Sequence, residues 1–365
     1  MKDPRLNKLA KLFLSHSLKL GEKEKVIISA VPSSKPLVKE IQKEAYALGV
    51  IPFILWQDEE TDRIMLEHAP EEQFRLHDKW FLEQFKDTDA LLVIRGEDND
   101  AELSSVPSEQ FVKRGKLLKP SDDYLYENLQ WVLFDYPTPA AAQKAKMNFD
   151  QYYDYVLDVS TVDYDAMRQA QQPLKDLMER TDQVRIVGPG TDISFSIKDI
   201  PAVICAGTHN VPDGEVYTAP VKDSVNGTIT YNTPSPYQGV VHQNVALTFK
   251  NGKIVEAVSD HTNKLNEVLD TDEGARYIGE FALGVNPLIK EPMGNILFDE
   301  KISGSLHFTP GDSYDETENG NSSSVHWDMV LIQRPEYGGG EIYFDDVLIR
   351  KDGLFVLEEL KGLNP

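Results

Sequence analysis

The sequence predicts two domains of different fold class: an α/β domain with a mostly parallel sheet over residues 1–182, and an α+β domain with mostly antiparallel strands over residues 183–365. Three observations support this prediction. At 365 residues, the chain is too long for one ordinary core. Short apolar runs alternate with helical periodicity in the first half, as in βαβ units. In the second half, short alternating segments are separated by turns rich in glycine and asparagine.

In the first half, a βαβ unit is the clearest element. The apolar runs at residues 26–31 and 51–56 flank a helical pattern over 36–48, and Gly49 stands where a helix C-cap is expected. No Gly-x-Gly-x-x-Gly follows the first strand, so we predict no dinucleotide site there. Further elements expected here are an amphipathic helix over 4–20, a helical stretch ending at 81–85, strands at 90–94 and 131–134, and a helix from 140 onward.

In the second half, the pattern is that of β-hairpins. Asn251-Gly252 lies between two alternating runs, 245–249 and 253–258, which predicts a hairpin with a type I′ turn. Gly188-Pro-Gly190 is interpreted as a tight turn. Other strands are expected at 184–187, 192–197, 326–332, 341–350 and 354–357, with one helix around 261–270.

Composition excludes several classes of function. The net charge is −23, which argues against nucleic-acid partners and against anionic membrane surfaces, because both need clustered lysine and arginine. No run approaches the ~18 apolar residues of a membrane span. The amino terminus reads as an amphipathic helix rather than a signal peptide, so we expect a cytoplasmic protein without membrane association. The single cysteine, Cys205, rules out a disulfide framework within the chain.

Candidate metal ligands gather in the second half. His326 and Asp328 are two residues apart, so on a strand both side chains project from one face. Glu215 follows a Pro/Gly turn, Glu280 is the only charge in an apolar stretch, and His307 follows a short small-residue segment. Two Glu, two His and one Asp suffice for two divalent ions such as Zn²⁺, Mn²⁺ or Co²⁺, with one carboxylate bridging. By spacing alone, surface glutamates and hydrogen-bonded histidines remain an open alternative.

Several longer segments make the chain similar to a known family. It resembles the M29 metallo-aminopeptidases of the thermophilic aminopeptidase T type, from about residue 130 to the end. The segments that carry the resemblance are Tyr136-Pro-Thr-Pro139, Val187-Gly-Pro-Gly-Thr-Asp192, Asn210-Val-Pro-Asp-Gly-Glu-Val-Tyr-Thr-Ala-Pro220, Leu269-Asp-Thr-Asp-Glu-Gly-Ala-Arg276, Gly279-Glu-Phe-Ala-Leu283, Ile296-Leu-Phe-Asp-Glu300 and His326-Trp-Asp328.

The resemblance implies a dimeric exopeptidase whose C-terminal domain holds two divalent ions. The family's ligand positions fall on Glu215, Glu280, His307, His326 and Asp328, with Glu280 as the bridging carboxylate. A family tyrosine near the metals falls on Tyr314. A further family glutamate has Glu300 as its nearest match, but the gap to His307 is longer than the family pattern, so Glu300 stays outside the predicted ligand set. The residues after His307 also depart from the family's small apolar run.

The predicted function is therefore a metal-dependent aminopeptidase that releases N-terminal residues from peptides and forms a homodimer. Glu215 or Glu280 would transfer the proton of the attacking water, and Tyr314 would donate a hydrogen bond to the developing oxyanion. Two alternatives remain open at this point. One is another metal-dependent hydrolase, such as an amidase, on the same scaffold. The other is a metal-binding protein without enzymatic activity.

Overall fold

The computed structural model describes residues 3–365, except for the side chain of Ser108, and its contacts divide the chain into two compact units. The first unit runs to Val162 and includes Gly207–Pro212; the second comprises Asp163–Ala206 and Asp213–Pro365. Helix α8 (Tyr164–Arg180) lies in the second unit and packs on strands β7 and β9. The domain boundary expected at residue 182 stays a prediction.

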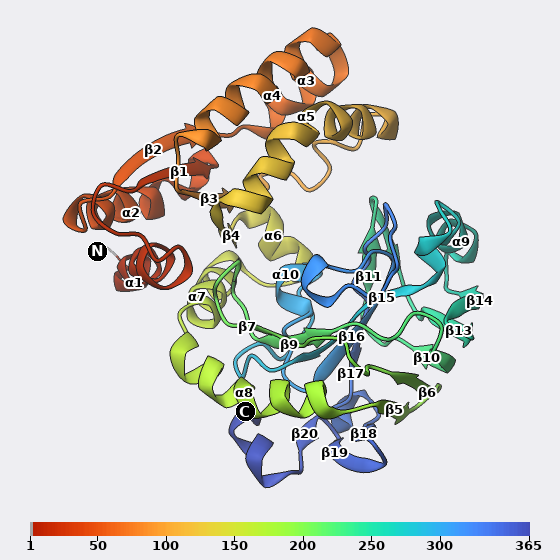
Figure 1. Ribbon diagram of the computed structural model, residues 1–365. Coiled ribbons are helices and arrows are strands. Elements are labelled where there is room, and N and C mark those ends of the chain that lie inside the picture. Colours follow the sequence, from red (N-terminus) through yellow and green to blue (C-terminus); the bar gives the residue numbers. More distant parts are fainter. Residues whose placement is uncertain (1–2) are drawn as a thin grey trace. The chain divides into compact units, whose positions relative to one another are not determined.

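The first unit contains a five-stranded sheet in the order β2-β1-β3-β4-β8, and every pairing in it is parallel. Figure 1 labels four of these strands, β1 to β4. Strand β1, which lies between β2 and β3, is almost continuously apolar and buried, as a parallel strand covered on both faces requires. The predicted α/β unit with a mostly parallel sheet is confirmed. The strands are β1 (Lys25–Ala30), β2 (Ile51–Trp56), β3 (Ala90–Arg95), β4 (Gln130–Asp135) and β8 (Asn210–Val211).

Helices cover both faces of this sheet. Helix α2 packs on β1 and β2, while Phe85 of α4 and Leu125 of α5 share a core cluster with Ile27 and Leu91. The helix expected over 4–20 is α1 followed by wider helical turns over Leu12–Ser17. No helix in residues 3–365 combines the length and apolar character needed to cross a bilayer. The helices are α1 (Pro4–Lys11), α2 (Lys35–Ala47), α3 (Glu59–His68), α4 (Glu71–Lys86), α5 (Ser108–Asn128), α6 (Pro139–Lys144) and α7 (Phe149–Ser160).

The second unit contains an eight-stranded antiparallel sheet in the order β14-β13-β10-β6-β5-β18-β19-β20. The predicted hairpin turn is confirmed, since Asn251 and Gly252 both have positive φ, 48° and 82°. The single strand expected over 341–350 is wrong: Asp345 and Asp346 also have positive φ and break it into a hairpin. The strands are β5 (Gln183–Gly188), β6 (Thr191–Ser196), β10 (Asn226–Thr230), β13 (Ala246–Lys250), β14 (Lys253–Val258), β18 (Glu341–Phe344), β19 (Val347–Lys351) and β20 (Leu354–Phe355).

A second antiparallel sheet in this unit has the order β17-β16-β15-β9-β7, and its buried faces contribute to one large apolar core shared with the eight-stranded sheet. The predicted α+β unit with mostly antiparallel strands is thus confirmed. The strands are β7 (Val203–Cys205), β9 (Glu215–Thr218), β15 (Ile278–Gly284), β16 (Ser305–Pro310) and β17 (Val330–Ile332), with a small ribbon of β11 (Ser235–Tyr237) and β12 (Val240–His242) and helices α9 (Thr262–Leu269) and α10 (Ile296–Asp299).

The strand expected over 326–332 is shorter than predicted, because regular pairing begins only at Val330. Two hydrogen bonds keep the preceding residues beside β16: Trp327 N donates to Pro310 O, and Phe308 N donates to Met329 O. Pro310 has no N–H to return a bond, so the ladder is interrupted there. The result is an irregular segment that still lies along the edge of the sheet.

Candidate metal centre

Three neighbouring strands carry Glu215, Glu280 and His307 on one face of the sheet. In β15, Glu280, Ala282 and Gly284 alternate and therefore project to the same face. Ala282 pairs with His307 of β16, and Gly284 pairs with Glu215 of β9. Ala282 presents only a methyl group beside His307, and a Cβ at Gly284 would lie 2.4 Å from Ile302 O and 2.9 Å from Glu300 O, so glycine there admits the backbone that follows α10. All three polar side chains are buried.

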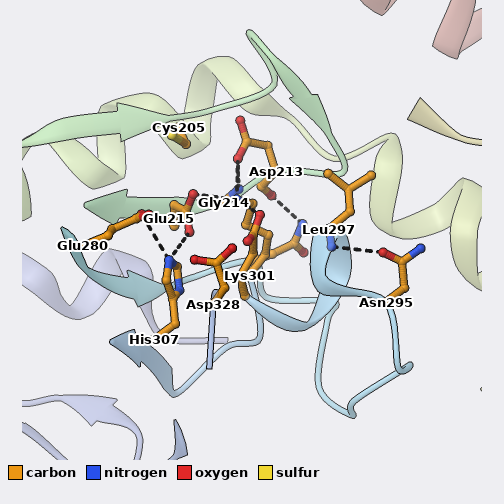
Figure 2. A network of polar contacts seen from close by, with 12 residues as sticks. Cys205, Asp213, Gly214, Glu215, Glu280, Asn295, Leu297, Lys301, His307 and Asp328 are labelled. Carbon is orange, nitrogen blue, oxygen red and sulfur yellow. Dashed lines mark hydrogen bonds and ion pairs between the residues drawn. The ribbon is translucent and has the colours of Figure 1, made fainter. Parts of the chain in front are cut away.

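Glu280 lies between two histidines and presents one oxygen to each. Its Oε1 is 3.2 Å from Nε2 of His307, and its Oε2 is 3.3 Å from Nε2 of His326. His307 Nε2 is also 3.4 Å from Oε2 of Glu215, and His326 Nε2 is 3.3 Å from Oδ1 of Asp328. Figure 2 shows His307 directed at Glu215 and Glu280 from the adjacent strand. The five predicted ligands thus form one continuous cluster.

The irregular segment before β17 is fixed by contacts that orient both of its polar residues. His326 forms an isolated antiparallel β-bridge with Gly311, and its Nδ1 is 3.0 Å from the carbonyl oxygen of Asp312. Thr309 donates a hydrogen bond of 2.7 Å to Oδ1 of Asp328. Contacts of this kind set the ring orientation of a metal-binding histidine and the position of a metal-binding carboxylate.

Tyr314 lies at the open side of the cluster. Its ring centre is 4.8 Å from that of His326 and 5.6 Å from that of Tyr217, and 45% of the residue is exposed. Burial of the hydroxyl, with the nearby carboxylates of Glu280 and Asp328, raises the pKa of Tyr314 well above its ordinary value. The phenol is therefore held in its protonated form, as a hydrogen-bond donor.

Two residues outside the predicted ligand set also belong to the cluster. Glu300 brings a carboxylate oxygen into a group with His307 and Asp328 in which the ligand atoms all lie within 4.8 Å of one another. Lys301 is buried beside Glu215 and Glu300. Lys301 carried a signal that was overlooked, since it is the only basic residue between the apolar start of α10 and His307.

The electrostatics of the cluster are those of crowded, buried acids. Burial lowers the pKa of His307, but the carboxylates of Glu215 and Glu280 raise it to about 10. Burial likewise opposes charge on His326, whereas Asp328 and Glu280 raise its pKa to about 12. Burial raises the pKa of Glu300 to about 8 despite the neighbouring lysine. The carboxylates therefore attract any available positive charge strongly.

The donor set fits divalent cations. Two groups contain the predicted ligands, Glu215 with Glu280 and His307, and Glu280 with His326 and Asp328; within each group the ligand atoms lie within 4.8 Å of one another. Oε2 of Glu215 and Nε2 of His326 are buried and make only the ion-pair contacts given above, without a well-aligned hydrogen bond among the described residues. Imidazole nitrogens with carboxylate oxygens suit Zn²⁺, Mn²⁺ and Co²⁺. The ligand roles themselves remain predictions.

Comparison with known proteins identifies the family and the fold. The sequence matches the thermophilic metalloprotease (M29) family over residues 2–345. Aminopeptidase 2 of Geobacillus stearothermophilus is 27% identical, with 95% of this chain and 94% of the relative covered. Aminopeptidase T of Thermus thermophilus is 26% identical, with 89% and 92% covered. The solved structure of wild-type AmpT from Thermus thermophilus superposes with a TM-score of 0.83 at 23% identity, covering 97% of this chain and 99% of that chain, and shows the same fold.

The family match extends over nearly the whole chain, and the parallel sheet of the first unit and the antiparallel sheets of the second accord with it. The protein belongs to the M29 family of thermophilic metalloproteases.

Proposed function

We propose that the protein is an aminopeptidase that removes N-terminal residues from peptides at a dinuclear divalent metal centre. Glu215, Glu280 and His307 would hold one ion, and Glu280, His326 and Asp328 the other. The observation that carries the proposal is the position of Glu280, whose two oxygens face two different histidines at 3.2 and 3.3 Å. A carboxylate in that position is suited to bridging two ions.

Charge balance supports two ions rather than one. Five carboxylates surround the cluster, and one ammonium group, that of Lys301, lies among them. Two divalent ions and one lysine carry as much positive charge as five carboxylates carry negative charge. Because isolated buried charge is costly, a neutral total is the stable arrangement. The carboxylates are those of Asp213, Glu215, Glu280, Glu300 and Asp328.

A pair of divalent ions in this donor set would activate a water molecule and polarise a scissile carbonyl. The protein's own groups supply the remaining steps. Tyr314, at the open side of the cluster, would donate a hydrogen bond to the oxyanion that forms from the carbonyl. The proton of the water would pass to a carboxylate of the cluster and then to the leaving amine. Glu215 and Glu280 were expected in this role; Glu300, outside the predicted ligand set, is a third candidate.

Relatives named aminopeptidase extend along nearly the full length of this chain, which supports peptides as substrates. The homodimer and the cytoplasmic location are retained as predictions from the sequence. The oligomeric state can be measured by light scattering on the purified protein.

The first experiment is hydrolysis of a panel of aminoacyl-p-nitroanilides before and after chelation, with Zn²⁺, Mn²⁺ or Co²⁺ then added back. We expect metal-dependent release from substrates with a free α-amino group and none from N-acetylated ones. Equal release from N-blocked substrates would favour an endo-acting hydrolase or an amidase. Two bound ions with no release from any peptide substrate would favour a metal-binding protein without this activity.

A further inference from the structure

Lys301 is a fully buried cation whose ammonium group is shared by several carboxylates. Its Nζ lies 2.5 Å from Oε1 of Glu215, 2.5 Å from Oε1 of Glu300 and 3.8 Å from Oδ1 of Asp213. The residue is 1% exposed. An ammonium has three donors and no lone pair, so Lys301 cannot itself bind a metal ion. Its contacts must act through the carboxylates that it touches.

The backbone at Lys301 is held on both sides. Its N–H donates to Phe298 O in the last turn of α10, and its carbonyl accepts a hydrogen bond of 3.1 Å from Asn286 N. The side-chain amide of Asn286 donates in turn to the carbonyl of Asp213. The segment that carries Lys301 is therefore tied to the segment that leads into Glu215, and Figure 2 shows Lys301 placed between them. Because its backbone is held on both sides, the Lys301 side chain places its ammonium group at a defined position.

As a consequence, the two oxygens of Glu215 contact different groups. Lys301 occupies Oε1, and Oε2 faces Nε2 of His307 at 3.4 Å with no hydrogen-bond partner among the residues described. Without the ammonium, the carboxylate would be free to rotate about its terminal bond. Groups that orient ligands in this way affect metal affinity almost as strongly as the ligands do.

Burial by itself does not explain why a lysine stands here. A buried ion pair is weak evidence for stability, because two charges must be withdrawn from water. The same space could be filled by an apolar side chain if the carboxylates had no other task. Lys301 instead holds its charge where Glu215 and Glu300 lie side by side: burial opposes that charge, but the two carboxylates raise the pKa of Lys301 well above its ordinary value.

We propose that Lys301 is a positioning residue that fixes Glu215 and Glu300 so that each directs one oxygen into the metal cluster. The proposal rests on the proposed dinuclear function for its consequence, but the orientation of Glu215 is a property of the protein alone. Lys301 thereby couples the α10 segment to the strand that supplies the first ligand.

The test combines metal titration with crystallography. Lys301→Met keeps the length and volume of the side chain and removes the charge, and Lys301→Gln keeps one amide donor and serves if the first variant does not fold. The matched control is Lys222→Met in the same unit, since Nζ of Lys222 contacts the Gly320 carbonyl and the Tyr277 ring rather than a carboxylate. Affinity for Zn²⁺ is measured by competition with a chromophoric chelator, without any substrate.

We expect the Lys301 variants to bind one of the two ions ~10–100-fold more weakly, the range found when an outer-shell partner is removed, with the control unchanged. In crystals of metal-free protein, the Glu215 carboxylate should turn away from His307 in the variants and not in the wild type. A folded variant that keeps the wild-type affinity and an unmoved Glu215 would overturn the proposal. If the wild-type protein holds Glu215 in the orientation fixed by Lys301 but does not bind two ions, the dinuclear function is refuted and the positioning role of Lys301 stands.

Discussion

Replacing Glu280 by glutamine is the most direct test of the proposed centre. The change is isosteric, so the 3%-exposed side chain should keep its place between β9 and β16. An amide has one acceptor oxygen where the carboxylate has two. One of the two histidines, at 3.2 and 3.3 Å, would then face an N–H₂ donor instead of an acceptor.

The magnitude follows from that geometry. One ion would lose a charged ligand outright and the other would lose the shared negative charge. Removal of an outer-shell partner already costs ~10–100-fold in metal affinity or activity. Loss of the bridging group should therefore lower kcat by at least ~100-fold, which corresponds to ~2.7 kcal/mol in the activation free energy.

The assay is release of p-nitroaniline under saturating metal, together with a count of bound ions by atomic emission. Glu256→Gln is the matched control, since Glu256 is an exposed strand residue in the same unit. Glu280→Gln should fold with the wild-type circular dichroism spectrum and retain no more than one ion. A variant that still binds two ions and turns over within tenfold of the wild type would refute the bridging role.

Three further predictions follow. Chelation should lower the Tm of the protein, and Zn²⁺, Mn²⁺ or Co²⁺ should restore it. An ion at 100 times its Kd contributes ~2.7 kcal/mol, which for the roughly 200-residue second unit corresponds to a Tm shift of ~5–10 °C in calorimetry. An unchanged Tm would argue against ion binding in the folded state. Tyr314→Phe should lower kcat by ~100-fold, of the order of ~3 kcal/mol, while chelator competition gives the wild-type metal affinity; an unchanged kcat would exclude the oxyanion contact. Asp272→Asn should destabilise the fold by ~1 kcal/mol at pH 7 after allowance for solvent screening. Burial raises the pKa of Asp272, but hydrogen bonds from Ser323, Ser324 and Ala275 lower it to about 2. Because a carboxylate whose folded-state pKa lies below its unfolded value stabilises the fold above pH ~4, the difference from wild type in urea unfolding should shrink as the pH falls from 4 towards 2.

The hydrophobic pattern and the turn residues were sufficient to predict those strands and turns for which a single physical effect dominates. The apolar runs that became β1 and β3 are largely buried on both faces, so their composition alone identifies them. The run that became the edge strand β2 is equally apolar, although Ile51, Phe53 and Trp56 are exposed. Asn251-Gly252 identifies a hairpin because both residues accept positive φ. The same tolerance in Asp345-Asp346 was missed, and the strand expected over 341–350 proved to be two.

The candidate site residues were proposed from a different kind of signal. The five expected ligands were proposed from unusual charge in apolar context and from family resemblance, and the structure brings all five together. Pair spacing could not reveal that Ala282 lies beside His307 and Gly284 beside Glu215, because that depends on the register of three strands. Lys301 and Glu300 enter the cluster from the end of α10, which lies between two strands of the sheet in sequence but has no spacing rule linking it to them.

The register of β15 also explains how so many acids can be tolerated in one place. The carboxylates of Glu215, Glu280, Glu300 and Asp328 come from four different backbone segments, and each contacts a polar partner: Thr309 for Asp328, Lys301 for both Glu215 and Glu300, and the two histidines for Glu280. The repulsion among the acids is therefore opposed by contacts with other groups of the protein. Partners that orient ligands in this way affect metal affinity almost as strongly as the ligands do, so the contacts of Thr309 and Lys301 belong to the site as much as the carboxylates that they hold.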